Sequence, residues 1–386
     1  SSWAPMSADE ELGLVYIPTN PPTIDYYAGF SPGANLFGTS VIALDVETGE
    51  RRWHFQTVHS DQWNYDLPNV PILADLNVDG QEVPALIQTT KQGFIYAFNR
   101  ATGEPLWPIE ERPVTQTEVP GNWTSPTQPF PTRPEPMEPL SVTEENVNDF
   151  NEELKQQALE IVAQHRVGGP YMPRLPIGYE GPHNFRCSGG LNITNPATLD
   201  PTTGILYASS SRGCSGGYVE PGAEHDEPDN PATTGRTISE WVAGQGRGLQ
   251  GPDNLPIFKP PYRRLSAYDM NTGERIWWIP TGTPPESVQN HPATRGMDYE
   301  SMGGGSPTIQ MVVGDLLVTG SRGSGESAPM LTAYDKLTGD FIGEVELPAS
   351  AQYGMMSYVH EGRQFIVVQV GDGGRHPGSL AAMALP

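Results

Sequence analysis

The chain has 386 residues, 43 glycines, 40 prolines and a formal net charge of −24 at pH 7. This charge argues against nucleic acid as a partner, and against an anionic membrane surface, because both bind to basic faces. No apolar run is long enough to cross a bilayer, and the sequence from Ser1 lacks a signal-peptide pattern, so we expect any targeting segment to lie upstream.

Short strands joined by many turns are predicted along the whole chain. Val, Ile, Tyr, Phe and Trp fall in short runs separated by Gly, Pro, Asn and Asp, a pattern typical of strands and turns. The sequence therefore predicts an all-β protein, and propellers, barrels and sandwiches of this length often form one unit.

One phrase recurs: a short apolar strand, then Asp or Asn, a turn closed by Thr-Gly, and an aromatic residue soon after. The clear copies are Asp45 to Trp53, Asn99 to Trp107, Asp269 to Trp277 and Asp335 to Phe341, with a weaker copy from Asp200 to Tyr207. In such a turn Asp or Asn accepts from backbone amides, Gly supplies a positive φ, and the aromatic ring packs between sheets. Recurrence at roughly 50 to 70 residues predicts four-stranded propeller blades. Hairpins in a sandwich would explain the turns but not the recurring Trp.

Two stretches interrupt the repeat. Residues 108–139 are crowded with proline and predict an extended surface excursion rather than a strand. Ser141 and Glu144 then form a capping-box pattern ahead of an amphipathic helix, so we expect an insertion over about 108–166 on the outside of the propeller. The apolar face of this helix is predicted to contain Phe150, Leu154, Ala158, Ile161 and Val162. Residues 213–256 are rich in Gly, Glu, Asp and Pro and predict a second, loop-like insertion.

Cys187 and Cys214 are the only cysteines. They have no CxxC spacing and no histidines at zinc-site spacing, which argues against a zinc site. They form either a disulfide in an oxidising compartment or two unrelated buried thiols.

Polar side chains gather in the segment from Trp53 to Pro68, which leaves a predicted strand and ends in proline. They are His59, Asp61, Asn64 and Asp66, beside Trp63 and Tyr65. Such a concentration is typical of a binding loop. Lys91 stands between strand-forming residues, where a cation is unfavourable unless it meets an anion. We therefore expect Lys91 to contact a ligand.

These residues resemble the signature of a known family. The loop from Thr57 to Pro68, Thr-Val-His-x-Asp-x-Trp-Asn-x-Asp-Leu-Pro, and the following Lys91-Gln92-Gly93 are similar to the membrane-type PQQ-dependent dehydrogenases that act on glucose, quinate and polyols. The resemblance covers nearly the whole chain, including the strings 3–7, 123–130 and 358–368.

The resemblance implies an eight-bladed quinoprotein propeller of which this chain covers only the later blades. It implies PQQ with a divalent metal, calcium or magnesium with a lanthanide as a further option, near the axis. The expected activity is oxidation of a sugar or polyol in the periplasm, with electrons passed to ubiquinone or a cytochrome. Membrane association would use a segment outside the chain, and the missing N-terminal blades would come from the same precursor or from another chain.

Residue by residue, Lys91 is similar to the family lysine that bonds the quinone oxygens. Thr23 is similar to a metal or cofactor oxygen donor, with Asn20 as the alternative in the same loop. Either Asn192 or Asn195 matches an amide that contacts a PQQ carboxylate. Asn64 and Asp66 stand at the positions of metal neighbours.

The sequence departs from the family at Asn64, where the pattern has an aspartate that serves as general base. An amide still offers oxygen to a metal but cannot accept the proton. Three explanations stand open: Asp66 or Asp61 has become the base, PQQ binds without ordinary turnover, or an aspartate is recorded as asparagine. The leading hypothesis is an enzyme, and the rival is a propeller that acts as a binding or assembly scaffold.

Overall fold

The chain folds into successive antiparallel sheets of short strands. The computed structural model describes residues 1–22, 25–222, 239–305, 308–323, 328–371 and 378–384. The first sheet contains β1 (Ser7–Asp9), β2 (Leu14–Pro18), β3 (Ser40–Asp45) and β4 (Arg51–Gln56), and the second contains β5 (Ile72–Val78), β6 (Gln81–Thr89) and β7 (Ile95–Asn99). In both sheets each strand pairs with the next one along the chain.

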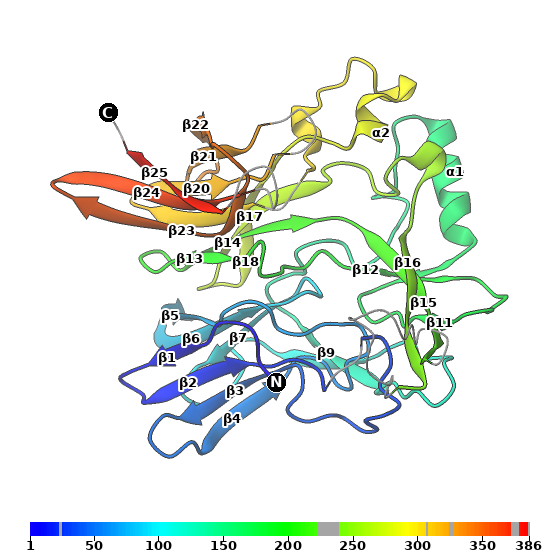
Figure 1. Ribbon diagram of the computed structural model, residues 1–386, viewed down its shortest axis with the longest axis horizontal. Coiled ribbons are helices and arrows are strands. Elements are labelled where there is room, and N and C mark those ends of the chain that lie inside the picture. The colour runs from blue at the N-terminus through cyan, green and yellow to red at the C-terminus, as the bar shows by residue number, and fades with distance from the viewer. Residues whose placement is uncertain (23–24, 223–238, 306–307, 324–327, 372–377, 385–386) are drawn as a thin grey trace.

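Three further antiparallel sheets follow, and in the first of these an insertion separates the second strand from the third. The third contains β13 (Thr198–Asp200), β14 (Ile205–Ser211), β17 (Arg263–Asp269) and β18 (Glu274–Pro280); the fourth contains β19 (Ile309–Val313), β20 (Leu316–Gly320), β21 (Met330–Asp335) and β22 (Phe341–Glu346); the fifth contains β23 (Ala351–His360), β24 (Arg363–Val370) and β25 (Ser379–Ala384). In Figure 1 the first two sheets lie at the lower left and the three later sheets lie above them. Their first strands meet, β1 with β5, β13 with β19 and β19 with β23. The sheets are therefore blades, and the predicted all-β propeller class is confirmed.

The recurring turns and aromatics connect neighbouring blades. In the first copy Asp45 Oδ1 accepts from Glu47 N at 3.1 Å, and the corresponding Asp or Asn of the other copies accepts from the residue two positions on. A Cβ added at Gly103 would lie 2.7 Å from the Trp53 ring, so the indole of the first blade rests on the Thr-Gly turn of the second. Trp107 rests on Gly273 and Trp277 on Gly339 in the same way. The weaker fifth copy differs, because its turn joins β13 to β14, the first two strands of a blade.

Both predicted insertions contain strands that the sequence did not indicate. In the first, β8 (Ile109–Pro113) pairs with β9 (Thr127–Pro131). A separate sheet, here called the side sheet, contains β10 (Arg166–Gly168), β11 (Leu175–Pro176), β12 (Asn184–Cys187), β15 (Cys214–Pro221) and β16 (Trp241–Gly248). The predictions of an excursion without strands over 108–139 and of a loop over 213–256 are therefore wrong at β8, β9, β15 and β16. The Gly and Pro residues in these segments hide the usual sequence pattern of a strand. Residues 223–238 of the second insertion lie outside the described residues.

The predicted helix is present as α1 (Glu152–Ala163), with Leu154 and Ala158 buried. The predicted capping box is wrong, because the N-cap is Asn151, whose Oδ1 accepts from Leu154 N at 2.8 Å. Ser141 and Glu144 lie too far upstream to reach the first turn. The short helices are α2 (Glu286–Gln289), η2 (Pro252–Asn254), η3 (Pro292–Thr294) and η4 (Glu300–Met302). In the described residues, no helix is both long and apolar enough to span a membrane.

Cys187 and Cys214 form a disulfide between β12 and β15. Of the two possibilities left by the sequence, the disulfide is therefore the one observed. It ties together two strands of the side sheet that are 27 residues apart in the chain.

Candidate functional site

Three loops of the first two blades surround a hollow of about 360 Å³. They are the β2–β3, β4–β5 and β6–β7 loops, which lie at the same end of their sheets because successive strands run antiparallel. The side chains that line the hollow include Trp3, Asn20, Asp25, Asn64, Asp66 and Lys91. The structure thus brings Asn64, Asp66 and Lys91 to one place, together with Asn20, the predicted alternative donor.

Lys91 points its ammonium at the β4–β5 loop. Nζ donates to Asn64 Oδ1 at 3.0 Å and to the Asn64 carbonyl at 3.2 Å, and it forms an ion pair with Asp66 Oδ1. The Lys91 side chain is 18% exposed and that of Asp66 is 8% exposed. Asp66 thus supplies, within the chain, the anion that was expected for this lysine, and the Lys91 side chain lines the hollow.

Asn64 owes its position to a left-handed backbone conformation, with φ of 63°. Asn adopts this region more readily than most residues. Its Nδ2 donates to Asp25 Oδ2 at 2.9 Å. Asn64 is therefore held between a carboxylate and an ammonium, with its amide oriented by both.

Asp25 is a site residue that our sequence reasoning missed. It is the single acidic residue between strands β2 and β3. A lone carboxylate in a Pro-rich loop is a sequence signal that could have identified Asp25 as a candidate site residue. Although Asp25 is exposed, loss of solvation beside the surrounding loops raises the pKa of its carboxyl, and the nearby Lys91 opposes this rise. A carboxyl with a raised pKa is better suited to accept a proton than one fixed in an ion pair.

Asp61 does not line the hollow. Its Oδ1 accepts from Trp63 N at 2.8 Å, and its Oδ2 accepts from Tyr65 N at 2.8 Å and from Thr39 Oγ1 at 3.0 Å. Burial raises the pKa of Asp61 to about 6, although these hydrogen bonds act against the rise. Asp61 therefore shapes the loop that presents Asn64, and its predicted role as a base has no geometric support here.

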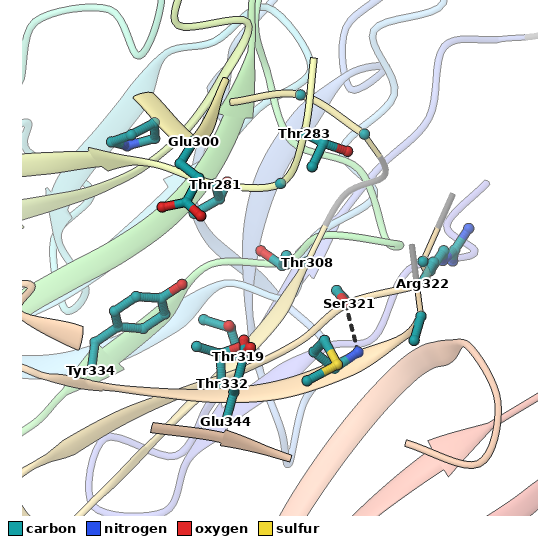
Figure 2. Close-up of a pocket in the computed structure, with 17 residues that line it drawn as sticks. Thr281, Thr283, Glu300, Thr308, Thr319, Ser321, Arg322, Thr332, Tyr334 and Glu344 are labelled. Carbon is teal, nitrogen blue, oxygen red and sulfur yellow. Dashed lines mark hydrogen bonds between the residues drawn. The ribbon is translucent and has the colours of Figure 1, made fainter. Parts of the chain in front are cut away.

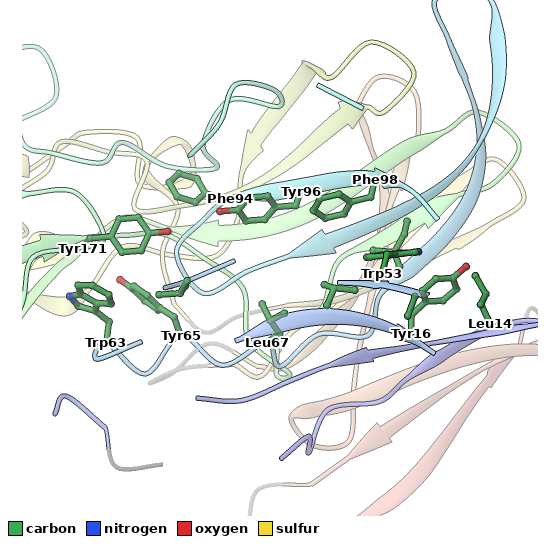
Figure 3. Packing of buried hydrophobic residues seen from close by; sticks show 14 residues of the cluster. Leu14, Tyr16, Trp53, Trp63, Tyr65, Leu67, Phe94, Tyr96, Phe98 and Tyr171 are labelled. Atoms are coloured by element: carbon green, nitrogen blue, oxygen red, sulfur yellow. The ribbon is translucent and has the colours of Figure 1, made fainter. Parts of the chain in front are cut away.

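A packed aromatic layer supports the hollow. Phe94, just before β7, and Tyr96 and Phe98 within it alternate along the chain and so share one face. Figure 3 shows this row of rings above Trp63 and Tyr65 of the β4–β5 loop at one end and above Trp53 at the other. Buried rings of this kind fix the loop that presents the polar side chains.

The oxygen donors of the hollow fit a hard divalent cation. Asn20 Oδ1 is buried and has no hydrogen-bond partner, and Asp25, Asn64 and Asp66 offer further oxygens. Calcium and magnesium prefer carboxylate and amide oxygen ligands. The described residues hold no group of three or more His, Cys, Asp or Glu side chains that could bind a metal, so the set depends on amide oxygens. Thr23, the predicted donor, lies outside the described residues.

Asn192 and Asn195 do not line this hollow. Asn195 is buried, with Oδ1 accepting from Asn192 N at 3.0 Å and Nδ2 donating to Ser209 O at 2.9 Å. Asn192 is exposed, and its Oδ1 accepts from Ile193 N at 2.8 Å. The loop before them does approach Lys91, since Leu191 N donates to Thr90 O at 3.0 Å. The side-chain amide nitrogen of Asn195 is used by its bond to Ser209 O, whereas the bonds of this turn leave the side-chain amide nitrogen of Asn192 available.

Another hollow, of about 340 Å³, lies between the third and fourth blades. Figure 2 shows hydroxyl groups around it, from Thr281 and Thr283 after β18 and from Thr319 and Thr332 on β20 and β21. No residue predicted from the sequence as a site residue lines it, so it does not bear on the site at Lys91.

The fold and the hollow define a β-propeller with an oxygen-rich site at the loop end of two adjacent blades. Residues 1–366 match the family of PQQ proteins described as "Glucose/ethanol/alcohol dehydrogenase, beta-propeller domain". The chain belongs to this family.

Individual relatives cover almost all of this chain. A "Probable quinate dehydrogenase (quinone)" of Xanthomonas campestris pv. juglandis is 30% identical over 398 residues, which is 97% of this chain and 48% of the relative. The glycerol dehydrogenase large subunit of Gluconobacter oxydans is 30% identical over 96% of this chain and 52% of the relative. The quinoprotein glucose dehydrogenase of Escherichia coli is 29% identical over 97% and 47%. The chain thus spans about half the length of these curated relatives.

Solved structures with the same fold include two quinohemoprotein alcohol dehydrogenases. The enzyme from Pseudomonas putida HK5 has a TM-score of 0.58 at 21% identity, over 96% of this chain and 44% of that structure. The one from Comamonas testosteroni has a TM-score of 0.57 at 18% identity, over 99% and 48%. At these identities the likeness supports the fold alone.

Proposed function

We propose that the protein is a PQQ- and divalent-metal-dependent dehydrogenase that oxidises an alcohol group of a sugar or polyol and passes the electrons to a quinone or a cytochrome. The observation that carries this proposal is the ammonium of Lys91, held beside Asn64 and Asp66 in an open, oxygen-lined hollow of a PQQ-family propeller. The named relatives oxidise glucose, glycerol and quinate, which supports this substrate class. The disulfide supports an oxidising compartment, and we propose the periplasm.

When bound, PQQ supplies a two-electron acceptor and the metal supplies a Lewis acid. Lys91 would bond the quinone oxygens, and the oxygens of Asn20, Asn64 and Asp66 would hold the ion, with calcium or magnesium as the first choice. Thr23 remains a proposed further donor.

The hydroxyl proton of the substrate needs an acceptor within the chain. Asn64 cannot accept it, because a neutral amide has no basic site at neutral pH. Both carboxylate oxygens of Asp66 are already engaged, one in the ion pair with Lys91 and the other as acceptor of the Trp3 Nε1 hydrogen bond of 2.9 Å. Asp25 has the raised pKa and only the Asn64 amide as a hydrogen-bond partner among the described side chains. We therefore assign the proton to Asp25, with Asp66 as a positioning residue for Lys91.

Reconstitution tests this proposal directly. The complete protein is incubated with PQQ and calcium or magnesium, freed of excess cofactor, and assayed for dye reduction with a panel of sugars, polyols and hydroxylated carboxylates. We expect retained PQQ absorbance and dye reduction with at least one of them. Asp25→Asn should lower turnover while PQQ stays bound. Absence of PQQ binding and of activity with every substrate would refute the proposal.

Asn64 favours a second candidate, a propeller that binds PQQ but does not turn over and serves as a scaffold. The loss of a carboxylate at the position of the family base is the observation behind it. The same experiment separates the two functions, since retained PQQ absorbance without dye reduction for any substrate would support the scaffold.

A further inference from the structure

A hollow of about 280 Å³ lies beside the Lys91 site, on the wall formed by the side sheet. Its lining includes Tyr26, Arg174, Asn184, Arg186 and Arg247. Asn184 and Arg186 come from β12, and Arg247 comes from β16. The side sheet, together with Arg174 just before β11, therefore places three guanidinium groups around one cavity, in a chain whose formal net charge is −24.

These three arginines make no ion pair with a carboxylate of the described residues. Arg174 lies 3.5 Å from the Tyr26 ring centroid, with Nη1 donating to Gly244 O at 2.9 Å. Arg186 Nη1 donates to Trp63 O at 2.7 Å. Arg247 lies over the Phe185 ring at 5.4 Å and is exposed. An arginine has five N–H donors, so rings and carbonyls orient these groups and leave donors available for an anion.

An unpaired acceptor lies in the same wall. Asn184 is 4% exposed, its Nδ2 donates to Pro173 O at 3.0 Å, and its Oδ1 has no hydrogen-bond partner. A buried acceptor without a donor is unfavourable by itself and suits a ligand that brings a hydroxyl. The cavity thus offers cationic donors for an anion and an acceptor for an O–H group.

This cavity and the Lys91 hollow share a wall. Tyr26 lines the cavity and follows Asp25, which lines the Lys91 hollow. Arg186 bonds the carbonyl of Trp63, and Asn64 is the next residue. The charges of Arg174 and Arg186 also reach Asp25 and act against the rise of its pKa. The two hollows therefore lie close enough together for one elongated molecule to occupy both.

We propose that the substrate is a hydroxylated carboxylate, whose carboxylate is bound by Arg174, Arg186 and Arg247 and whose reacting alcohol lies in the Lys91 hollow. This inference rests on the proposed function for the reacting end, and it names the chemical class of the substrate. The Asn184 amide oxygen accepts from a hydroxyl near the carboxylate. The side sheet, which is not part of the blades, thereby determines specificity.

Binding measurements test the proposal without turnover. Calorimetry on the complete protein without PQQ compares D-gluconate with D-glucitol, which have the same run of hydroxyls and differ in the carboxylate. We expect gluconate to bind at least about tenfold more tightly, because charge-assisted hydrogen bonds are stronger than neutral ones. Raising the salt concentration should weaken gluconate binding and leave glucitol binding unchanged.

Two variants of Arg247 locate the anion. Arg247→Gln should lower the gluconate affinity about tenfold and leave glucitol unchanged, and Arg247→Glu should lower it further. Arg247 is exposed and its side chain makes no hydrogen bond within the described residues, so the substitution leaves the β15–β16 backbone pairing in place. Arg51→Gln is the matched control, because Arg51 is exposed and lies 4.6 Å from the Phe37 ring centroid, on β4.

Equal binding of gluconate and glucitol, or equal losses for both in Arg247→Gln, would overturn the proposal. A variant that loses PQQ affinity but keeps gluconate affinity would also overturn it, since the arginines would then serve the carboxylates of the cofactor. Arginine-dependent gluconate binding in a protein that never reduces dye would refute the proposed function and leave the anion site standing.

Discussion

Replacing Lys91 with Met should destabilise the protein by about 2 to 3 kcal/mol. The Asp66 side chain is 8% exposed, and without the ammonium its carboxylate retains only the Trp3 Nε1 hydrogen bond of 2.9 Å among the described side chains. Removing one partner of a buried pair costs about 3–5 kcal/mol, because it leaves an uncompensated charge. Because the hollow is open to water, which screens the charge, we take a value at or just below the lower end of that range. Urea unfolding at pH 7 measures the change from the midpoint at constant m-value.

Two comparisons isolate the ion pair. Lys155→Met removes the pair with Glu144, whose side chain is 71% exposed, and should change stability by less than about 0.5 kcal/mol. Adding Asp66→Asn to Lys91→Met should restore at least about 1 kcal/mol, because the buried charge is then gone. The reasoning is refuted if Lys91→Met is no more destabilising than Lys155→Met.

Three further predictions concern the same two blades. Asn64→Asp should raise dye-reduction turnover by about tenfold or more, since it adds a carboxylate at the position of the family's base, next to Asp25, and Asp also tolerates a positive φ; an unchanged or lower rate would count against a role for this position in proton transfer. Asp61 has a pKa of about 6 against an ordinary value of 3.8, so its contribution to stability is greatest below pH 3.8 and is lost as the pH rises through 6. Urea unfolding should therefore show wild type losing roughly 2.4 kcal/mol relative to Asp61→Asn between pH 4 and pH 7, and parallel pH profiles would contradict this. Trp53→Ala should cost about 3–5 kcal/mol of unfolding free energy, because the buried indole rests on Gly103 and donates to Arg100 O at 2.9 Å; a loss below about 1 kcal/mol would show that the contact between blades is weak.

The blades could be predicted because their signals are local. Each Thr-Gly turn is specified by an Asp or Asn and a Gly a few residues apart, and Trp53, Trp107 and Trp277 follow at fixed spacing. A turn of this kind forms from neighbouring residues whatever the rest of the chain does. What the local pattern could not indicate is that each indole rests on the turn of the next blade.

The side sheet escaped prediction for the opposite reason. β15 and β16 contain five glycines between them, at 216, 217, 244, 246 and 248, and their pairing joins segments far apart in the chain. Glycine weakens a strand signal, and only tertiary contacts select the partner. The same insertion carries Arg247, whose role depends on where β16 lies.

The candidate site, too, could be predicted only in part. Lys91 and Asp66 were recognisable because a cation among strand residues needs an anion. Asp61 and Asn195 have the same chemistry as ligands, but their side-chain oxygens accept from backbone amides of their own loops, a frequent use of short polar side chains that sequence does not distinguish from binding. Asp25 enters the site only because the β2–β3 loop folds toward Asn64.

A diffraction map of the complete protein crystallised with PQQ and calcium tests the central claim most directly. We predict quinone density within hydrogen-bonding distance of Lys91 Nζ, and an ion bound by oxygens that include those of Asn64 and Asp66. A map with PQQ bound elsewhere, or with Lys91 still paired only to Asp66 and Asn64 at saturating cofactor, would contradict the account.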